Sequence, residues 1–245
     1  MQQRTNVMLV GLAALALTAA CDNTVPAWQL DNDRIIAVRA TPPGLLAGER
    51  ARLDVLVTAQ GVGPQVISPQ LAIAVPSDAA MVEVPEALRA AVAPEGGGWR
   101  VTAPSEPELA QLRGSLGLSA DAPVPLRVGV RVELGGAPFD AVKTVMLGEA
   151  RANPALGAVT VGGAAPADGL IVPVEEDVEL RVEVAETEEV LWLTSVGELS
   201  DQDDPVATLR RPKDSEDPVD GHVSVVVRDG EGGVTWGFWT ASVAP

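Results

Sequence analysis

The sequence predicts an all-β protein made of two β-sandwich domains. Apolar residues make up 47% of the chain, which is enough to fill two hydrophobic cores. Valine recurs at alternate positions in many short segments, as expected of strands with one buried face. The 24 glycines and 20 prolines supply turn residues between these segments. Short alternating strands joined by frequent turns are typical of sandwiches.

The first predicted domain spans residues 34–149. Its clearest strand is Val124–Leu134, in which aliphatic side chains face one way and charged side chains face the other. A turn at residues 41–44 ends the first strand, because its two prolines cannot continue a ladder. Residues 135–138 predict a hairpin. The expected strands cover residues 34–40, 52–59, 71–75, 99–103, 124–134 and 139–147, with helical turns at 86–92 and 107–112.

A break at residues 150–154, which contains Asn153-Pro154, precedes the second predicted domain at residues 154–245. Valine and leucine alternate with charged residues along 177–184, so one face of this strand is core and the other meets water. A glycine-rich turn at 229–233 pairs the last two strands. The expected strands cover residues 156–161, 170–174, 177–184, 190–196, 222–228 and 234–243.

Tryptophans indicate how the second domain packs. Trp192 stands where an immunoglobulin-like sandwich often places a core tryptophan. In the last strand, Trp236 and Phe238 are expected on one face and Trp239 on the other. The strand pattern is also compatible with a fibronectin-type module or a small Greek-key barrel, so the sequence predicts the class more firmly than the topology.

The first twenty residues have the pattern of an export signal. Arg4 gives a short cationic region, and residues 7–20 form an apolar run. A helix of that length rises about 21 Å, which is less than the roughly 30 Å hydrocarbon core of a bilayer. We therefore expect a signal peptide rather than a lasting transmembrane span.

The run ends at Cys21, which is the only cysteine of the chain. The segment Leu17-Thr18-Ala19-Ala20-Cys21 resembles the lipobox of bacterial lipoproteins, although that family prefers leucine at the position of Thr18. The resemblance implies cleavage before Cys21 and a lipid anchor, including palmitate, on its thiol. Acyl chains contribute about 0.8 kcal/mol per buried CH₂, so two or three of them hold a protein on a bilayer. An ordinary secretory signal with a chance cysteine is the alternative.

Residues 21–33 are expected to form a lipidated N-terminus and a short polar tether. Asp22 resembles the inner-membrane retention signal of some envelopes, but the rule varies between lineages, so the choice of inner or outer membrane stays open. Within the tether, Trp28 is expected to pack against the first domain, with the membrane interface as the alternative.

Two further stretches carry a resemblance. Residues 35–43 with 47–49, and residues 225–236, are similar to the first strand and the closing hairpin of uncharacterised bacterial lipoproteins that bear immunoglobulin-like domains. The resemblance implies a location in the bacterial cell envelope and an immunoglobulin-like fold. It supplies no catalytic residues.

Charge excludes one class of partner. The formal net charge is −17, and it is concentrated in the second half: residues 22–148 hold 10 basic and 14 acidic residues, and residues 149–245 hold 6 and 20. Such a surface repels nucleic acid, and no basic stripe compensates for it. Contact with a membrane is therefore expected through acyl chains on Cys21 rather than through charge.

The sequence offers little that could support catalysis. His222 is the only histidine, and no Gly-x-Ser-x-Gly elbow accompanies it. Zinc ligands, a Walker loop and a dinucleotide fingerprint are absent from the sequence, so no cofactor is expected. We interpret His222 as a strand-end residue and expect no catalytic residues.

Acidic residues in two loops of the second domain raise the alternative of a calcium site. Their carboxylates would supply the hard oxygen ligands that calcium prefers. However, the first loop lacks the glycine of an EF-hand, and Pro212 stands where such a loop places its bidentate glutamate. A solvated acidic loop is the favoured interpretation. The candidates are Asp201, Asp203, Asp204, Glu216, Asp217 and Asp220.

These observations predict a non-enzymatic, membrane-anchored envelope lipoprotein. Its two sandwiches would act as a structural spacer or as a docking module for an envelope protein or a glycan. A calcium-dependent adhesion module is the first alternative, and a hydrolase of unrecognised type is the second.

Overall fold

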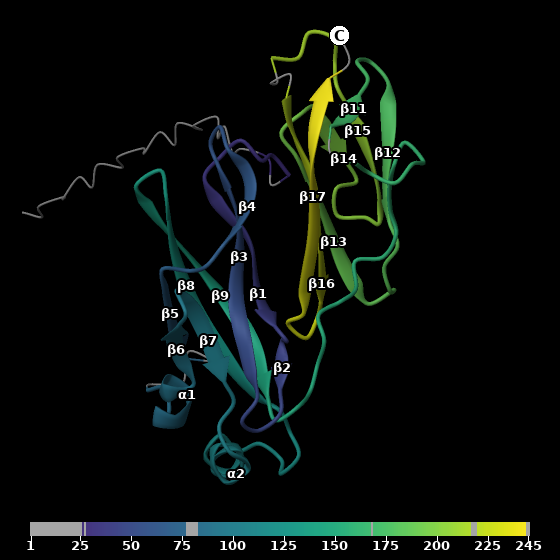
Figure 1. The fold of residues 1–245 in the computed structure, drawn as a ribbon. Helices are drawn as coiled ribbons and strands as arrows, with labels where there is room; N and C mark the ends of the chain where they lie inside the picture. The colour runs from purple at the N-terminus through teal and green to yellow at the C-terminus, as the bar shows by residue number, and fades with distance from the viewer. Residues whose placement is uncertain (1–25, 27, 77–82, 168, 217–219, 244–245) are drawn as a thin grey trace, which may run out of the picture.

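The structure, a computed structural model, describes residues 26, 28–76, 83–167, 169–216 and 220–243 (Figure 1). The predicted signal peptide, Cys21 and Asp217 lie outside the described residues. Within these ranges, no helix is long and apolar enough to cross a lipid bilayer. Strands dominate and form four sheets, so the predicted all-β class is confirmed.

The first sandwich packs a five-stranded sheet against a four-stranded sheet. The first has the order β1-β3-β7-β6, with β4 also paired to β3, and the second has the order β2-β9-β8-β5. Neighbouring strands are antiparallel except for β2 and β9. The strands are β1 (Arg34–Thr41), β2 (Gly44–Leu45), β3 (Arg50–Ala59), β4 (Gly63–Ile67), β5 (Leu71–Val75), β6 (Val92–Glu95), β7 (Gly98–Thr102), β8 (Val124–Leu134) and β9 (Ala137–Leu147).

The core between these two sheets follows from the alternation along β8 and β3. Leu126 and Val128 of β8 are fully buried, as are Leu53 and Val55 of β3, and all four belong to one apolar cluster. Transfer of such side chains out of water is the main term that holds sheets together. The predicted period of β8 is therefore confirmed.

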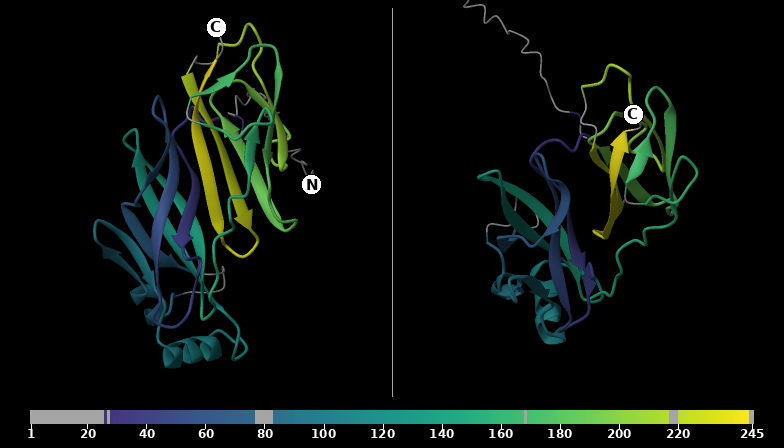
Figure 2. Two further views of the ribbon diagram at one scale, coloured as in Figure 1. Left: turned by 45° about the vertical axis from the view of Figure 1, so that its right-hand side comes forward. Right: turned by 45° about the horizontal axis from the view of Figure 1, so that its top comes forward.

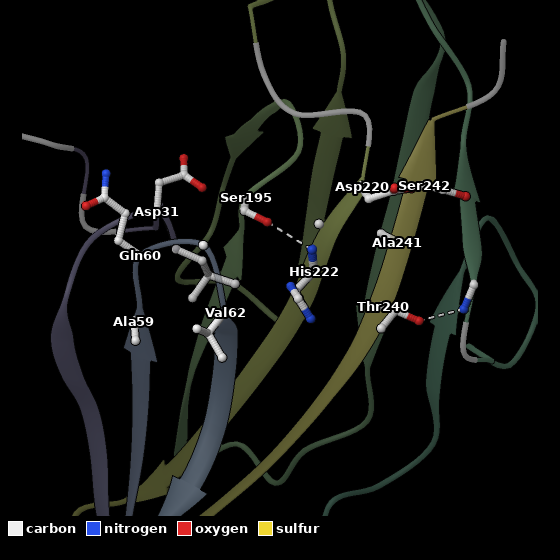
Figure 3. Close-up of a pocket in the computed structure, with 15 residues that line it drawn as sticks. Asp31, Ala59, Gln60, Val62, Ser195, Asp220, His222, Thr240, Ala241 and Ser242 are labelled. Carbon is white, nitrogen blue, oxygen red and sulfur yellow. Dashed lines mark hydrogen bonds between the residues drawn. The ribbon is translucent and has the colours of Figure 1, made fainter. Parts of the chain in front are cut away.

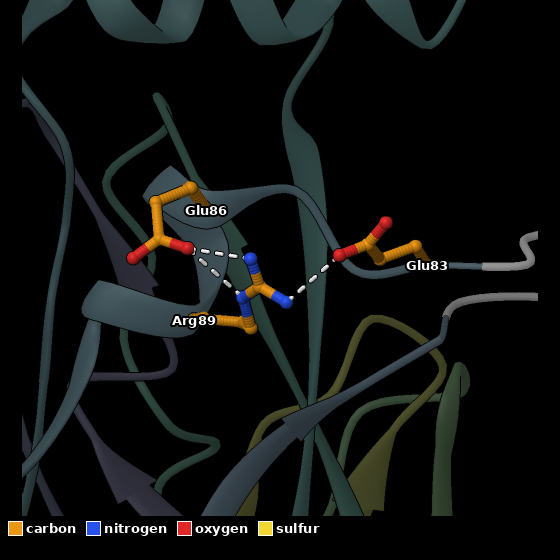
Figure 4. A network of polar contacts seen from close by, with 3 residues as sticks. All are labelled: Glu83, Glu86 and Arg89. Atoms are coloured by element: carbon orange, nitrogen blue, oxygen red, sulfur yellow. Dashed lines mark hydrogen bonds and ion pairs between the residues drawn. The ribbon is translucent and has the colours of Figure 1, made fainter.

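Two short helices close one end of the first sandwich: α1 (Glu86–Ala90) and α2 (Glu106–Ser115) (Figure 1). Helix α2 begins with a capping box, in which the Ser105 backbone N–H donates to the Glu108 carboxylate over 2.9 Å. Beside α1, the Arg89 guanidinium bridges Glu86 and Glu83, with 3.1 Å between Arg89 Nη1 and Glu83 Oε1 (Figure 4). These exposed ion pairs position the helix and contribute little to stability.

The second sandwich is built from two four-stranded sheets. Their orders are β10-β12-β15-β14 and β11-β17-β16-β13. Trp192 is fully buried in the core between them, as predicted, and Trp239 packs against the same core. The strands are β10 (Val159–Val161), β11 (Leu170–Val172), β12 (Asp177–Val182), β13 (Glu188–Thr194), β14 (Glu198–Ser200), β15 (Val206–Arg210), β16 (Asp220–Asp229) and β17 (Val234–Val243).

Five strands were not predicted: β2, β4, β6, β14 and β15. All five have five residues or fewer, and β2, β4, β6 and β14 hold proline, glycine or charged residues that favour turns. The fifth, β15, lies between β12 and β14 and completes its sheet. Pro205 and Pro212 flank this short alternating run, so the sequence alone favours a loop here rather than a strand. The predicted turn at residues 42–43 carries the chain from β1 in one sheet to β2 in the facing sheet.

The two sandwiches pack against each other along a seam (Figure 2). On the first sandwich the seam is formed by β1 and β3, and on the second by β13, β16 and β17. The buried side chains of the seam are at most 6% exposed, so water is excluded from this surface as it is from either core. The buried members of the seam are Leu30, Ala37, Leu56, Leu193, Val226 and Val234.

The N-terminal tether enters the seam before the first strand begins. The Leu30 N–H donates to the Thr194 carbonyl over 2.9 Å, and the Thr194 N–H donates to the Trp28 carbonyl over 2.9 Å. On the other side, the Thr58 hydroxyl donates to the Leu30 carbonyl over 2.5 Å. Trp28 packs against the core of the second sandwich. The prediction that Trp28 packs against the first domain is therefore wrong, because its neighbours come from a strand 160 residues later in the sequence.

Leu193→Ala tests the seam without touching either sandwich core. Leu193 is 1% exposed, and removal of a buried leucine side chain costs about 2–5 kcal/mol of unfolding free energy. We expect urea denaturation to show this loss and to separate the unfolding of the two sandwiches into two transitions. Ile171→Ala, at a residue that is 60% exposed, is the control and should leave the transition unchanged. An unchanged midpoint for Leu193→Ala would contradict a stabilising seam.

Candidate functional site

At one end of the seam the sandwiches separate, and a cleft of about 810 Å³ opens between them (Figure 3). One wall comes from the β3–β4 hairpin of the first sandwich, and the other comes from β16 and β17 of the second. Leu30 and Asp31 of the tether form part of its border. A cleft of this size between two domains is a common place for ligands. It is the candidate site of this protein.

His222 is the third residue of β16, and its ring lies against the β3–β4 hairpin. A Cβ atom added to Gly63 would lie 2.3 Å from His222 Cε1, so glycine is required for this close approach. Gly63 also has a φ of +81°, which favours glycine. Burial lowers the pKa of His222, because desolvation disfavours the charged form of the imidazole.

Ser195 and His222 do not form a catalytic pair. The Ser195 hydroxyl accepts a hydrogen bond from the backbone N–H of His222 over 2.9 Å. Figure 3 shows this bond ending at the backbone nitrogen, with the imidazole ring pointing away from the serine oxygen. A histidine acts as the base for a serine through a ring nitrogen. This geometry therefore gives Ser195 no base.

The polar side chains of the cleft are two carboxylates, which accept hydrogen bonds, and neutral groups that can both donate and accept them. Carboxylates come from Asp31 and Asp220, and hydroxyls come from Ser195, Thr240 and Ser242. No lysine or arginine is among the described residues that line the cleft. Such a lining suits a neutral, hydroxyl-rich ligand or a cationic group better than an anion.

Asp203 and Asp204 lie at the opposite end of the second sandwich from Asp220. Asp203 and Asp204 border a hollow that they share with Glu188. Glu188 pairs with Asp229 at the far end of β16, whereas Asp220 begins that strand and borders the cleft. Ten residues of strand span about 30 Å, so these carboxylates cannot share one ion.

Asp201 follows β14, and its carbonyl accepts the N–H of Asp204 within the acidic turn. Glu216 is the last described residue before a gap in the described chain, and Asp217 lies within that gap. Among the residues that the structure describes, no group of three or more His, Cys, Asp or Glu residues is placed to hold a metal ion.

Polar contacts join the two sandwiches at the other end of the seam. The sequence did not predict them. Lys143 donates from Nζ to the Gly232 carbonyl in the β16–β17 turn, and Arg151 forms an ion pair with Glu231 in the same turn. Burial lowers the pKa of Lys143 to about 8. No local pattern indicates these contacts, because each joins residues about 80 or more positions apart.

Asn153 and two arginines complete this set. The Asn153 side chain donates to the Ala40 carbonyl and accepts from the Val234 N–H, each over 2.9 Å. Arg39 of β1 lies 4.0 Å from the centre of the Trp236 ring, which is a favourable cation–π contact. Arg228 donates to the Ile36 carbonyl over 3.0 Å. The predicted inter-domain break is thus a bridge that bonds to both sandwiches.

Comparisons with known proteins give no family. No protein-family model matches the chain, and no curated protein matches it. Tandem Ig repeats of Dlar align over 86% of this chain and 97% of that chain, with 14% identity and a TM-score of 0.29. The N-terminal Ig1-2 module of the Drosophila receptor protein tyrosine phosphatase DLAR aligns over 87% and 99%, with 13% identity and a TM-score of 0.31.

A nucleoside hydrolase-related hypothetical protein from Saccharophagus degradans aligns over 38% of this chain at 14% identity, with a TM-score of 0.28. The present chain covers only 26% of that protein. The assignment of two sandwiches rests on the strand pairing of this chain itself, since all three TM-scores lie below 0.5.

The lowered pKa of Lys143 predicts a pH dependence of stability. Between pH 8 and 10.5 the unfolded chain holds a proton on this lysine that the native chain lacks, so the unfolding free energy rises with pH in this window. The added stability is lost as the pH falls to the native pKa. From pH 7.5 to 9.5 we expect a gain of about 2 kcal/mol, measured by urea denaturation.

Lys143→Met is the matched variant because it keeps the apolar stem and removes the titrating group. It should lose this pH dependence. The chain has no tyrosine and only one other lysine, Lys213, so few other groups titrate in the same window. Equal slopes for the parent chain and Lys143→Met would show that Lys143 is not held with a lowered pKa.

Proposed function

We propose that this chain is a non-enzymatic envelope lipoprotein whose two sandwiches form one rigid body, anchored through acyl chains on Cys21. The body acts as a spacer and presents the cleft as a docking site for an envelope protein or a glycan. The observation that carries the proposal is the path of the tether, which is hydrogen-bonded to Thr194 of one sandwich and to Thr58 of the other.

The length of the tether limits how far the body can lie from a bilayer. Seven peptide steps lead from Cys21 to Trp28, and they span at most about 24 Å when fully extended. Because Trp28 packs on the second sandwich, only the segment from Cys21 to Trp28 sets the distance between the folded body and an anchor. An anchored Cys21 would therefore hold the cleft, which Leu30 and Asp31 border, close to the membrane surface.

The seam supports the role of a spacer. Tandem domains joined only by a linker move independently. Here an apolar cluster and the contacts of Asn153 and Lys143 join the sandwiches from one end of the seam to the other. A rigid body of this kind holds its far end at a fixed distance from its anchored end, as a spacer requires.

The cleft supports docking rather than catalysis. Its one histidine is turned from Ser195, and its carboxylates and hydroxyls are spread over strands of both sandwiches and the tether. Such a surface offers hydrogen bonds to the hydroxyl groups of a glycan or to the cationic side chains of a protein.

Metabolic labelling with palmitate tests the anchor. We expect the chain to incorporate label and to sediment with membranes, and Cys21→Ser to abolish both, because the thiol is the site of acylation. Asp22→Ser is the matched control and should retain the label. Label retained by Cys21→Ser would contradict the proposed anchor.

The non-enzymatic part has its own test. We expect the purified protein to show no turnover of ester, peptide or glycan substrates above the level of His222→Ala. Turnover that disappears in His222→Ala would identify an enzyme and overturn this part of the proposal.

A further inference from the structure

Strand β5 is an edge of the first sandwich. It lies at the end of the β2-β9-β8-β5 sheet, at the outer margin of the molecule (Figure 1). Among the described residues its backbone ladder is with β8 alone, and β6 and α1 are its neighbours without pairing to it. Natural edge strands are usually protected by charge, proline, a bulge or a covering helix or loop. The segment Leu71–Val75 contains no charge, proline or bulge, and its register with β8 is unbroken.

Other edges of the molecule are protected. Strand β6 contains Pro94, and β13 carries Glu188 and Glu189. Strands β10, β11 and β14 have only three residues each, β2 has two, and β4 contains Pro64. Strand β1 carries two arginines and a bulge, and the part of β9 that β2 leaves unpaired carries an aspartate and a lysine. Strand β5 therefore stands apart among the described edges in being both apolar and long enough to pair.

The outer face beside this edge is apolar and hollowed. Ile73, Gly129 and Val142 lie side by side on β5, β8 and β9. Ile73 and Val142 are each 50% exposed, and Gly129 has no side chain to cover them, so a hollow of about 400 Å³ remains. Leu71 adds a further 38% exposed side chain on the same strand. Exposed apolar groups that gather in this way mark interaction surfaces.

Charge on this face favours a second copy of the same chain. Arg131 and Asp140 neutralise each other through two 2.7 Å contacts, and Arg127 is balanced by Glu133 on the same strand. The face is thus neutral on a chain whose net charge is −17. Two copies that meet here keep their acidic second sandwiches apart. A strongly charged partner of either sign would find no complementary charge on this face.

We propose that two copies of this chain associate through antiparallel pairing of β5 with the β5 of the second copy. A twofold axis at Ile73 sets the two Ile73 side chains opposite each other and sets each Leu71 opposite a Val75. The two four-stranded sheets then become one continuous eight-stranded sheet. The contact is self-complementary and uses up both edges, so assembly stops at the dimer.

Sedimentation velocity over a range of concentrations tests the association. We expect the full chain with Cys21→Ser to shift from monomer to dimer between about 10 μM and 1 mM, as suits a small interface. Ile73→Lys should remove the dimer, because it places two cations at the twofold axis. Ile171→Lys is the matched control: Ile171 is 60% exposed on the second sandwich, and its change should leave the dimer intact.

Disulfide capture tests the register. In the Cys21→Ser chain, Ile73→Cys introduces a single thiol at the axis, where paired Cα atoms lie about 4.5–5.5 Å apart, within disulfide reach. We expect rapid cross-linked dimers from Ile73→Cys and none from Ile171→Cys. Leu71→Cys alone should not cross-link, whereas a mixture of Leu71→Cys and Val75→Cys chains should.

Each result decides the proposal. A monomer at all concentrations would overturn it, as would equal loss of association in Ile73→Lys and Ile171→Lys. Cross-linking by Leu71→Cys alone would overturn the antiparallel register. Folding of each variant is checked by its β-type circular dichroism, and the conservative Ile73→Val should dimerise if Ile73→Lys does not fold. None of these measurements depends on the lipid anchor or on the cleft.

Discussion

The apolar seam between the two sandwiches is the constraint on which the rest of the structure depends. A sheet with one face on its own core and the other in water needs apolar side chains only at alternate positions. β13 and β16 bury side chains on both faces, because Trp192 and Val225 point into their own core while Leu193 and Val226 point into the seam. Since the seam removes these second faces from water, two modules that could otherwise move independently become one body.

The seam also explains the position of the tether and the cleft. Leu30 is a buried member of the seam cluster, so the tether must run between the sandwiches to bring it there. Its backbone groups then need partners, and Thr194 and Thr58 supply them from opposite sides. Gly63 of the hairpin and His222 of β16 are in close contact, so the two elements cannot approach further here. The cleft lies between them. The candidate site is thus a consequence of how two finished sandwiches meet.

Polar groups at the closed end of the seam are arranged differently from those in the cleft. Lys143, Arg228 and Asn153 donate to backbone carbonyls of β1 or of the β16–β17 turn. These bonds are directional, so they fix the angle between the sandwiches, which the apolar cluster alone would leave free. Desolvation of Lys143 is the cost of this arrangement, and it is visible in the lowered pKa of that side chain.

The sequence by itself determined the all-β class, the period of β8, the core position of Trp192 and the location of the longest strands, because the alternation of a half-buried strand appears in neighbouring residues. It also predicts that there is no catalytic set, since His222 is the only histidine, and this stays a prediction. Only the tertiary structure decided that β15 is a strand, that Trp28 belongs to the second sandwich and that Asp203 and Asp220 lie far apart. These features depend on contacts between residues distant in the chain, which leave no local period. The continuous apolar runs at residues 35–38, 55–57, 190–193 and 225–227 were a signal of the seam, but such runs do not reveal which surface covers the second face.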